Sequence, residues 1–406
     1  MNNKQISVFS LPVIVAALGY FVDIYDLLLF AIVRLPSLKS LNLGDAQVAR
    51  DGQWILNMQM IGLLIGGIFW GILGDKKGRM RVLFASIVIY SIGNIANGFV
   101  NNVTEYGWVR FFSGIGLAGE LGAGITLVTE LLPKEKRGIA TSLVAGVGLL
   151  GAVVAFIIKQ YFDWRICYFV GGGLGFLLLL LRVSVHESGM FKSIENKEVS
   201  KGNFFMLFTN GKRFKKYITA ILVGLPTWYV IGILVAFSKE FGVAMHVNGV
   251  IDPGKSVMIT YINTSIGGIL IGFTSKWLKS RKQALYIFYL VTAIGIVWFF
   301  KSENAATSQV YIACALLGLG TGFWSIFVTM AAEQFGTNIR ATVATTVPNM
   351  IRGSLVLISM LFNWLQHYNS YVVSGWITGI AVIVIGVGAV AASEETYHKD
   401  LNYVEV

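Results

Sequence analysis

Long apolar stretches alternate with short polar ones along nearly the whole chain. Each apolar stretch is about 20 residues long, which is the length that an α-helix needs to cross a bilayer. Twelve such stretches can be laid out, at residues 10–34, 54–74, 82–100, 104–130, 138–159, 165–184, 216–239, 255–276, 283–301, 307–332, 340–364 and 371–392. The pattern therefore predicts an all-α integral membrane protein with twelve transmembrane helices.

One hydrophilic connection is much longer than the others and divides the twelve predicted helices into six and six. We therefore expect an N-terminal six-helix bundle over residues 1–184, a cytoplasmic linker over 185–215, a C-terminal six-helix bundle over 216–392 and a cytoplasmic tail over 393–406. The linker contains the segment FFMLF between lysine-rich flanks, a pattern that favours an amphipathic helix lying on the membrane surface.

Composition supports a membrane protein. The 406 residues are 55% hydrophobic and only 13% charged, and the mean hydropathy is +0.69, which a water-soluble globule could not cover with a polar surface. The two cysteines, Cys167 and Cys314, both fall inside apolar stretches and show no metal-ligand spacing. Since no catalytic triad, phosphate loop or metal constellation is visible, we expect no enzyme activity, no cofactor and no metal.

The net charge of +11 reflects topology rather than nucleic-acid binding. In alternate connections, the side that carries the N-terminus holds 22 lysines and arginines and the other side holds 7, and the cations are not interleaved with base-stacking aromatics. Cytoplasmic loops carry the excess of such residues, so both termini are predicted to be cytoplasmic. The partners we expect are the lipid bilayer, protons and a small-molecule substrate, and no nucleic acid.

Two acidic residues lie near the middle of the first predicted helix. Asp23 and Asp26 are three residues apart on one helical face. An acid at this depth costs roughly 2.5 to 3.5 kcal/mol, so it should face a cavity or a partner. Both cannot ionise cheaply in a low-dielectric site, and one should hold a proton near neutral pH, which suits proton coupling. The alternative is a pair neutralised permanently by a neighbouring arginine.

The fourth predicted helix carries two further charges. Arg110 lies near its outer third, and Glu120 lies about 15 Å further in by helical rise. Arg110 stays charged at any accessible pH, so it could hold a substrate carboxylate or act on the acids of the first helix. Glu120 is a second candidate for proton coupling, or a polar contact to a neighbouring helix.

The eleventh predicted helix combines a proline with a mid-membrane arginine. Pro348 can break the helix beside Asn349 and Arg352, and such a site suits an anion, although an internal salt bridge would also explain Arg352. The candidate substrate-binding residues are Arg110, Arg352, Tyr25, Asn57, Trp228, Tyr229, Trp324 and Asn349. For the aromatic members, interface belts or lipid packing are an equally good explanation.

A short basic turn, GILGDKKGRMRV at residues 71–82, joins the second and third predicted helices. It spells Gly-x-x-x-Asp-(Arg/Lys)-x-Gly-(Arg/Lys)-x-(Arg/Lys) and resembles the loop between helices 2 and 3 of the major facilitator superfamily of secondary transporters. That resemblance implies two pseudo-symmetric six-helix bundles and a cytoplasmic gate. The gate would consist of Gly74, Asp75, Gly78, Arg79, Glu130, Arg137, Glu333 and Arg340, the last four occupying matching places in the two halves. Plain topology and helix-end charge remain the alternative for these residues.

The first 190 residues resemble one branch of that superfamily more closely. Gly19-x-x-x-Asp23-x-Tyr25-Asp26, Gly119-Glu120-Leu121-Gly122 and the Trp164-Arg165 pair are similar to signatures of the metabolite:proton symporters, in which Glu is more usual where Asp23 stands. The resemblance implies proton symport of organic acids or zwitterions. Since Arg352 is not part of the branch pattern, the substrate is left open.

The sequence thus predicts a proton-coupled uptake symporter for a small organic anion or zwitterionic metabolite, multi-pass in a bacterial inner membrane. Asp23, Asp26 and Glu120 would take the proton. Because folds of this kind usually work as monomers, we expect a monomer. The alternatives are a proton-coupled exporter of drugs or metabolites and a non-transporting membrane sensor.

Overall fold

The computed structural model describes residues 10–122, 124, 128, 132, 134–182, 203–336 and 339–397. In this part of the chain the regular elements are helices, apart from an isolated β-bridge between Asn248 and Ala306. The expectation of an all-α protein is confirmed.

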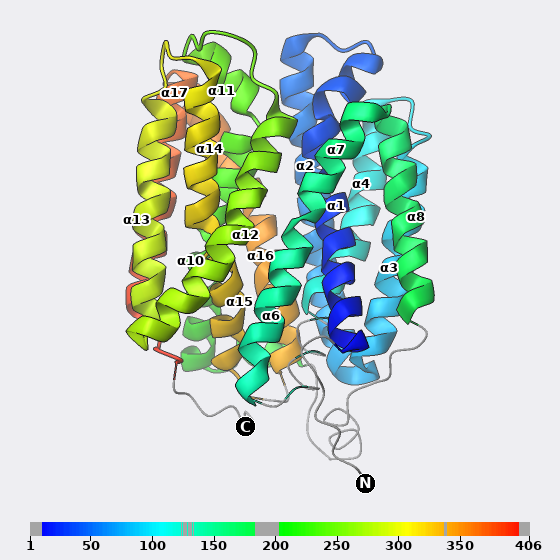
Figure 1. Cartoon of the computed structure of the whole chain (residues 1–406), viewed down its shortest axis with the longest axis vertical. Coiled ribbons are helices and arrows are strands. Elements are labelled where there is room, and N and C mark those ends of the chain that lie inside the picture. Colours follow the sequence, from blue (N-terminus) through cyan, green and yellow to red (C-terminus); the bar gives the residue numbers. More distant parts are fainter. Residues whose placement is uncertain are drawn as a thin grey trace.

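Two groups of helices stand side by side, the first half in blue to blue-green and the second in green to red (Figure 1). The first half contains α1 (Leu11–Ser40), α2 (Asp45–Lys77), α3 (Arg79–Asn97), α4 (Val103–Leu117), α6 (Lys134–Leu149), α7 (Gly151–Tyr161) and α8 (Trp164–Arg182). The second half contains η1 (Phe204–Leu207), α10 (Gly211–Tyr229), η2 (Val230–Val235), α11 (Ser238–Ala244), α12 (Pro253–Leu278), α13 (Arg281–Phe300), α14 (Thr307–Thr321), α15 (Trp324–Glu333), α16 (Arg340–Leu365) and α17 (Tyr371–Ala392). The start of α1 and the end of α17 lie at the same end of the molecule, here called the inner end; the opposite end is the outer end.

Eleven helices of the described residues are long and apolar enough to cross a membrane. They correspond to eleven of the twelve predicted spans. The remaining one, predicted at 104–130, begins as α4, but residues 123, 125–127 and 129–130 lie outside the described residues.

Of the eleven spans that the structure describes in full, three are interrupted rather than continuous. The fifth is divided into α6 and α7, and the tenth into α14 and α15. The seventh changes from α10 to the π-helical segment η2 just after Pro226, whose missing N–H removes one helical hydrogen bond. Such local changes of helix type often occur at functional sites.

Glycines set the closest helix contacts, and they do so at matching places in the two halves. Gly62 and Gly114 bring α2 and α4 so close that a Cβ at either position would collide with the carbonyl group of Phe111 or Gln59. In the second half, Gly267 and Gly318 do the same for α12 and α14. Small residues of this kind let helix backbones approach each other in a membrane.

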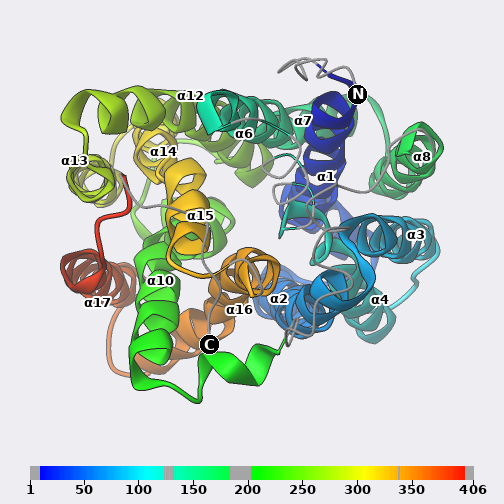
Figure 2. The same ribbon diagram turned by 90° about the horizontal axis from the view of Figure 1, so that it is seen from below.

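The two halves meet along two helix pairs, seen from the inner end in Figure 2. The first pair is α2 with α16, and the second is α6 and α7 with α12. These are the second and eleventh, and the fifth and eighth, of the predicted spans, so the pairs are related by the pseudo-symmetry of the halves.

The structure describes only the second part of the predicted linker, from residue 203 onward, and helix α10 begins earlier there than expected. Residues 183–202 lie outside the described residues, and α10 begins at Gly211 rather than near 216 because Asn210 caps its first turn. The expected amphipathic helix is a single 3-10 turn, Phe204–Leu207, with Phe204 and Leu207 buried. The boundaries of the two bundles stay a prediction.

The glycine contacts generate a stability prediction. Gly114→Ala should destabilise the protein by about 1–3 kcal/mol, because the new methyl group meets the Gln59 carbonyl and the helices must separate. Thermal unfolding in detergent would measure the change. Gly173→Ala in α8 is the matched control, since nothing lies within 4 Å of a Cβ there; equal effects of the two substitutions would contradict the packing account.

Candidate functional site

An ion pair joins the two halves near the centre of the molecule. Asp23 of α1 and Arg352 of α16 are buried to 0% and 1% side-chain exposure, and Arg352 Nη2 lies 3.5 Å from Asp23 Oδ2. Neither Asp23 oxygen has a hydrogen-bond partner, whereas Arg352 Nη1 donates to Asn349 Oδ1 at 3.1 Å. The contact is therefore a long ion pair between two buried charges, and each half contributes one of them.

A small cavity of about 20 Å³ lies beside this pair. Arg352 and the aromatic side chains of Tyr20, Trp228, Tyr261 and Trp324 are among the residues that line it. That volume has room for about one water molecule, so the centre is nearly closed in this conformation. Arg352, Trp228 and Trp324 were predicted as substrate-binding residues, and the structure brings them together around this cavity.

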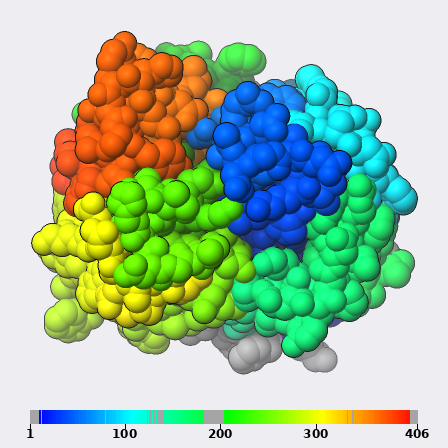
Figure 3. All heavy atoms as spheres, turned by 90° about the horizontal axis from the view of Figure 1, so that it is seen from above, coloured from blue at the N-terminus to red at the C-terminus, as the bar shows by residue number. Residues whose placement is uncertain are grey.

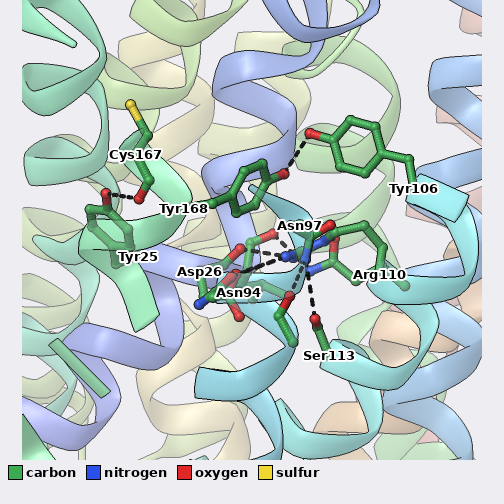
Figure 4. A network of polar contacts seen from close by, with 12 residues as sticks. Tyr25, Asp26, Asn94, Asn97, Tyr106, Arg110, Ser113, Cys167 and Tyr168 are labelled. Atoms are coloured by element: carbon green, nitrogen blue, oxygen red, sulfur yellow. Dashed lines mark hydrogen bonds and ion pairs between the residues drawn. The ribbon is translucent and has the colours of Figure 1, made fainter. Parts of the chain in front are cut away.

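A second buried ion pair lies entirely within the first half (Figure 4). Arg110 Nη1 donates to Asp26 Oδ1 at 2.8 Å, and Nη2 donates to the Asp26 carbonyl at 3.0 Å. Its Nε donates to Gln59 at 3.3 Å, and both charged side chains are fully buried. All three nitrogens of the Arg110 guanidinium thus have a partner within the first half. Its role in substrate binding stays a prediction.

The third buried pair is Glu120 with Arg182 at the end of α8. Arg182 Nη1 donates to Glu120 Oε2 at 3.0 Å, and Nη2 contacts the other carboxylate oxygen. Both side chains are about 1% exposed. Gly19 of α1 lies against them, and a Cβ at that position would occupy the space that the pair fills. Sequence reasoning identified Glu120 but missed Arg182, which looks like an ordinary cation at the end of a span.

The two acids of α1 have different partners. Their spacing led us to expect one shared low-dielectric site, but Asp26 points to Arg110 and Asp23 to Arg352. The alternative left open from sequence, neutralisation by a neighbouring arginine, describes Asp26 well because its hydrogen bonds are short. It describes Asp23 less well, because the contact with Arg352 is long.

The remaining predicted substrate-binding residues lie outside the central cavity. Tyr25 donates to the Cys167 carbonyl at 2.8 Å, inside the first half (Figure 4), and Tyr229 donates to the Gly375 carbonyl at 2.6 Å. Asn57 and Asn349 connect the halves instead, donating to Ser359 Oγ at 3.0 Å and to the Ala118 carbonyl at 2.8 Å. A role of these four in substrate binding stays a prediction.

At the inner end, the predicted gate residue Asp75 joins α2 to α16. Its carboxylate is buried and accepts hydrogen bonds from the Thr342 backbone N–H at 2.8 Å and the Thr342 hydroxyl at 2.6 Å. Gly78 ends α2 with a φ of 98°, a conformation that favours glycine. Gly74 packs near Val82. Glu130 and the side chains of Arg79 and Arg137 lie outside the described residues.

The second-half gate candidates contact their own half. Glu333 forms an ion pair with Arg281 at 2.7 Å, and Arg281 belongs to the basic turn between α12 and α13. Arg340 donates to the Phe335 carbonyl at 3.1 Å. A role of Glu333 and Arg340 in a cytoplasmic gate stays a prediction.

Three ion pairs at the outer end connect the halves, and sequence reasoning missed them. Arg34, 1% exposed, reaches Glu240 at 2.8 Å. The other two are Lys159 with Asp252 at 2.9 Å and Lys239 with Asp45 at 3.3 Å. All three combine one residue from each half. The sequence offers no signal for them, because each partner taken alone resembles a charge at a helix end.

Among the described residues, no three His, Cys, Asp or Glu side chains are grouped so that they could hold a metal ion. The expectation of no cofactor rests on the sequence alone. The arrangement of the site is instead one of buried charge pairs within and between two helix bundles.

The outer ion pairs generate a conformational prediction. Glu240→Gln leaves the buried Arg34 without its carboxylate, at a cost of about 3 kcal/mol to the state with a closed outer end. Spin labels at Tyr161→Cys and Val250→Cys, which are exposed in opposite halves, should then lie farther apart. Pulsed electron–electron double resonance would measure the distance between the two labels. Glu394→Gln, which breaks a pair with Lys216 inside the second half, should leave the distances unchanged. Unchanged distances in Glu240→Gln would show that Arg34 does not hold this end closed.

Comparison with known proteins gives one consistent answer. The family model described as the Major Facilitator Superfamily matches residues 16–347. The chain is 26% identical to the niacin transporter NiaP of Acinetobacter baylyi, over 80% of each chain. It is 25% identical to the sialic acid transporter NanX of Escherichia coli, over 90% of this chain and 89% of that one. The crystal structure of a D-xylose-proton symporter has the same fold, with a TM-score of 0.71 at 18% identity over 97% of this chain and 100% of the other. The chain therefore belongs to the Major Facilitator Superfamily and is a multi-pass membrane transporter rather than an enzyme.

Proposed function

We propose that the protein takes up a small organic anion or zwitterion bearing a carboxylate, together with a proton, by alternating access. The observation that carries the proposal is the long ion pair between Asp23 and Arg352, beside the central cavity that Arg352 lines. A substrate carboxylate would bind Arg352, and Asp23 would then lose its ion pair with that arginine. The membrane would be a bacterial inner membrane, with the inner end and both termini in the cytoplasm.

The charge balance of the cavity explains why proton and substrate would move together. Without substrate, Arg352 and Asp23 neutralise each other. When a substrate carboxylate takes Arg352, an ionised Asp23 is left unpaired in a buried site, which is costly in the membrane. A proton on Asp23 restores neutrality. Anion and proton therefore bind as a set, and either one alone leaves a net charge that opposes closure.

The contact geometry supports substrate exchange at this pair rather than at the others. Charge-assisted bonds between arginine and carboxylate are normally about 2.7–2.9 Å long. The Asp26 bond to Arg110 meets that range at 2.8 Å, whereas the Asp23 contact is 3.5 Å. A mobile carboxylate can therefore approach Arg352 more closely than Asp23 does. The aromatic side chains around the cavity suit the organic part of such a molecule.

The relatives support a carboxylate substrate. Niacin and sialic acid, named for the two transporters reported above, are both carboxylic acids. Their pyridine ring and sugar skeleton differ greatly in size, so the carboxylate is the group that they share. This agreement favours an anion at Arg352 over a cationic drug.

Alternating access requires contacts that break in turn at each end. The Asp75 bonds to Thr342 join the halves at the inner end, and the pairs of Arg34, Lys159 and Lys239 join them at the outer end. A surface ion pair contributes only about 1 kcal/mol or less, so the exposed pairs can open readily. In our proposal, neutralisation of the central cavity lets the halves rock and exchange one set of contacts for the other.

The first test is proton movement into liposomes that contain the purified protein. A panel of carboxylates that includes nicotinate, together with neutral sugars, is added outside while a pH-sensitive dye reports on the medium. We expect a carboxylate to cause alkalinisation. Asp23→Asn should abolish that signal while still binding substrate, and Arg352→Gln should reduce uptake at least about tenfold, or about 1.4 kcal/mol. Glu303→Gln, at an exposed loop position, is the control.

Two results would contradict the proposal. If Asp23→Asn still moves protons with substrate, Asp23 is not the coupling acid. If carboxylates move protons only when they are loaded inside the liposomes, and they leave in exchange for protons that enter, the protein is an exporter.

A second test separates proton coupling from structure at Glu120. Removing one partner of a buried ion pair costs about 3–5 kcal/mol, whereas replacing both is much milder. Glu120→Gln should therefore lower the melting temperature strongly, and the double variant Glu120→Gln, Arg182→Gln should recover most of the loss. If the stable double variant still couples protons to uptake, Glu120 has a structural role; loss of coupling alone would make it a proton carrier.

A further inference from the structure

A second and much larger cavity lies at the outer end, where the start of α2 meets the end of α16 and the start of α17. Its volume is about 410 Å³, within the range of small-molecule sites. It shares no lining residue with the central cavity. Figure 3 looks onto this face, where the blue segment of α2 borders the orange segment of α16 and α17.

The lining of this outer cavity is suited to an anion. Arg50 and His367 are the lining residues that can carry a positive charge, Tyr371 is the other ionisable one, and no carboxylate is among the lining residues. Arg50 is largely exposed and forms an ion pair with Asp51 at 2.8 Å, a contact that uses Nε rather than the terminal guanidinium nitrogens. The other acids nearby already have cations, since Glu240 pairs with Arg34 and Asp45 with Lys239.

His367 faces this space from the opposite half. Its Nδ1 lies 3.0 Å from the Asn363 carbonyl and 3.3 Å from the Trp364 carbonyl. Because carbonyl oxygens only accept hydrogen bonds, Nδ1 carries a hydrogen and Nε2 is the nitrogen that can meet a ligand. In the protonated ring Nε2 also donates, so a carboxylate would find one cation from each half of the transporter.

Amide side chains that line the same cavity as Arg50 and His367 add hydrogen-bond donors. Gln366 donates to Asn363 at 3.1 Å, and Asn363 donates to Gln53 Oε1 at 3.0 Å. This chain ends on the oxygen of Gln53, so the Gln53 amide hydrogens remain available. Phe237 and Tyr371 supply aromatic surface to the same cavity. The combination of the Arg50 cation, the His367 imidazole, an amide donor and aromatic rings fits a planar carboxylate.

We propose that this outer cavity is a first binding site for planar organic carboxylates on their way to Arg352. The inference rests on the proposed function above, because it assumes that a carboxylate is transported. A ligand held by Arg50 and His367 touches both halves before the central cavity opens. The Asn363 bond to Gln53 and the Ser359 bonds to Asn57 lie along the same helix pair, so they separate this site from the centre.

The test uses 4-fluorobenzoate as the probe and fluorine NMR of the protein in nanodiscs. Arg352→Gln should lose central binding but keep weak binding of the probe. Adding Arg50→Gln and His367→Gln to that variant should weaken the remaining binding at least tenfold. Lys301→Gln, which removes a cation at the C-terminal end of α13, should not weaken it. All of these outer side chains are exposed, so their exchange should not unfold the protein.

Each failure has its own signature. If Arg352→Gln binds no probe, or if its residual binding ignores the loss of Arg50 and His367, the outer site is overturned. Failure of the proposed function would show differently, as wild-type proton-coupled uptake in Arg352→Gln. Transport kinetics give a second measurement: Arg50→Gln with His367→Gln should raise KM and leave kcat unchanged, and an unchanged KM would contradict a capture site.

Discussion

Burial of charge in the membrane is the constraint on which the rest of this structure depends. Asp23, Asp26 and Glu120 are buried, and each meets an arginine from another helix. Two of these pairs fasten helices of the first half to one another. The third crosses between the halves, is longer, and borders the central cavity. In the proposed mechanism the first two pairs stay fixed and the third exchanges its carboxylate for that of the substrate.

The packing of the helices makes such pairing possible. Glycines bring α2 against α4 and α12 against α14, so the helices within each half are closely packed. Between the halves, α2 and α16 touch through amide, hydroxyl and carboxylate groups such as Asn57, Ser359, Asp75 and Thr342. Hydrogen bonds of this kind hold a surface in register and can be exchanged for others when the surface slides. Rigid halves with a polar contact between them are what a rocking motion requires.

The sequence predicted the membrane fold well, because apolar stretches of fixed length and a basic turn are local features. Of the predicted substrate-binding residues, Arg352, Trp228 and Trp324 come together at the central cavity, and their residue types are unusual or bulky at membrane depth. It failed where the answer depends on which helices become neighbours. The spacing of Asp23 and Asp26 could not show that they face different arginines, and Arg34, Arg182 and Lys159 gave no sign of their partners.

The central claim is that a substrate carboxylate replaces Asp23 on Arg352 and that Asp23 then takes a proton. Calorimetric titration of the protein with its carboxylate substrate, in buffers of different ionisation enthalpy, measures protons taken up on binding without any transport step. The account predicts one proton taken up for each carboxylate bound by the wild type, and none by Asp23→Asn. Binding that takes up no proton in the wild type would contradict it.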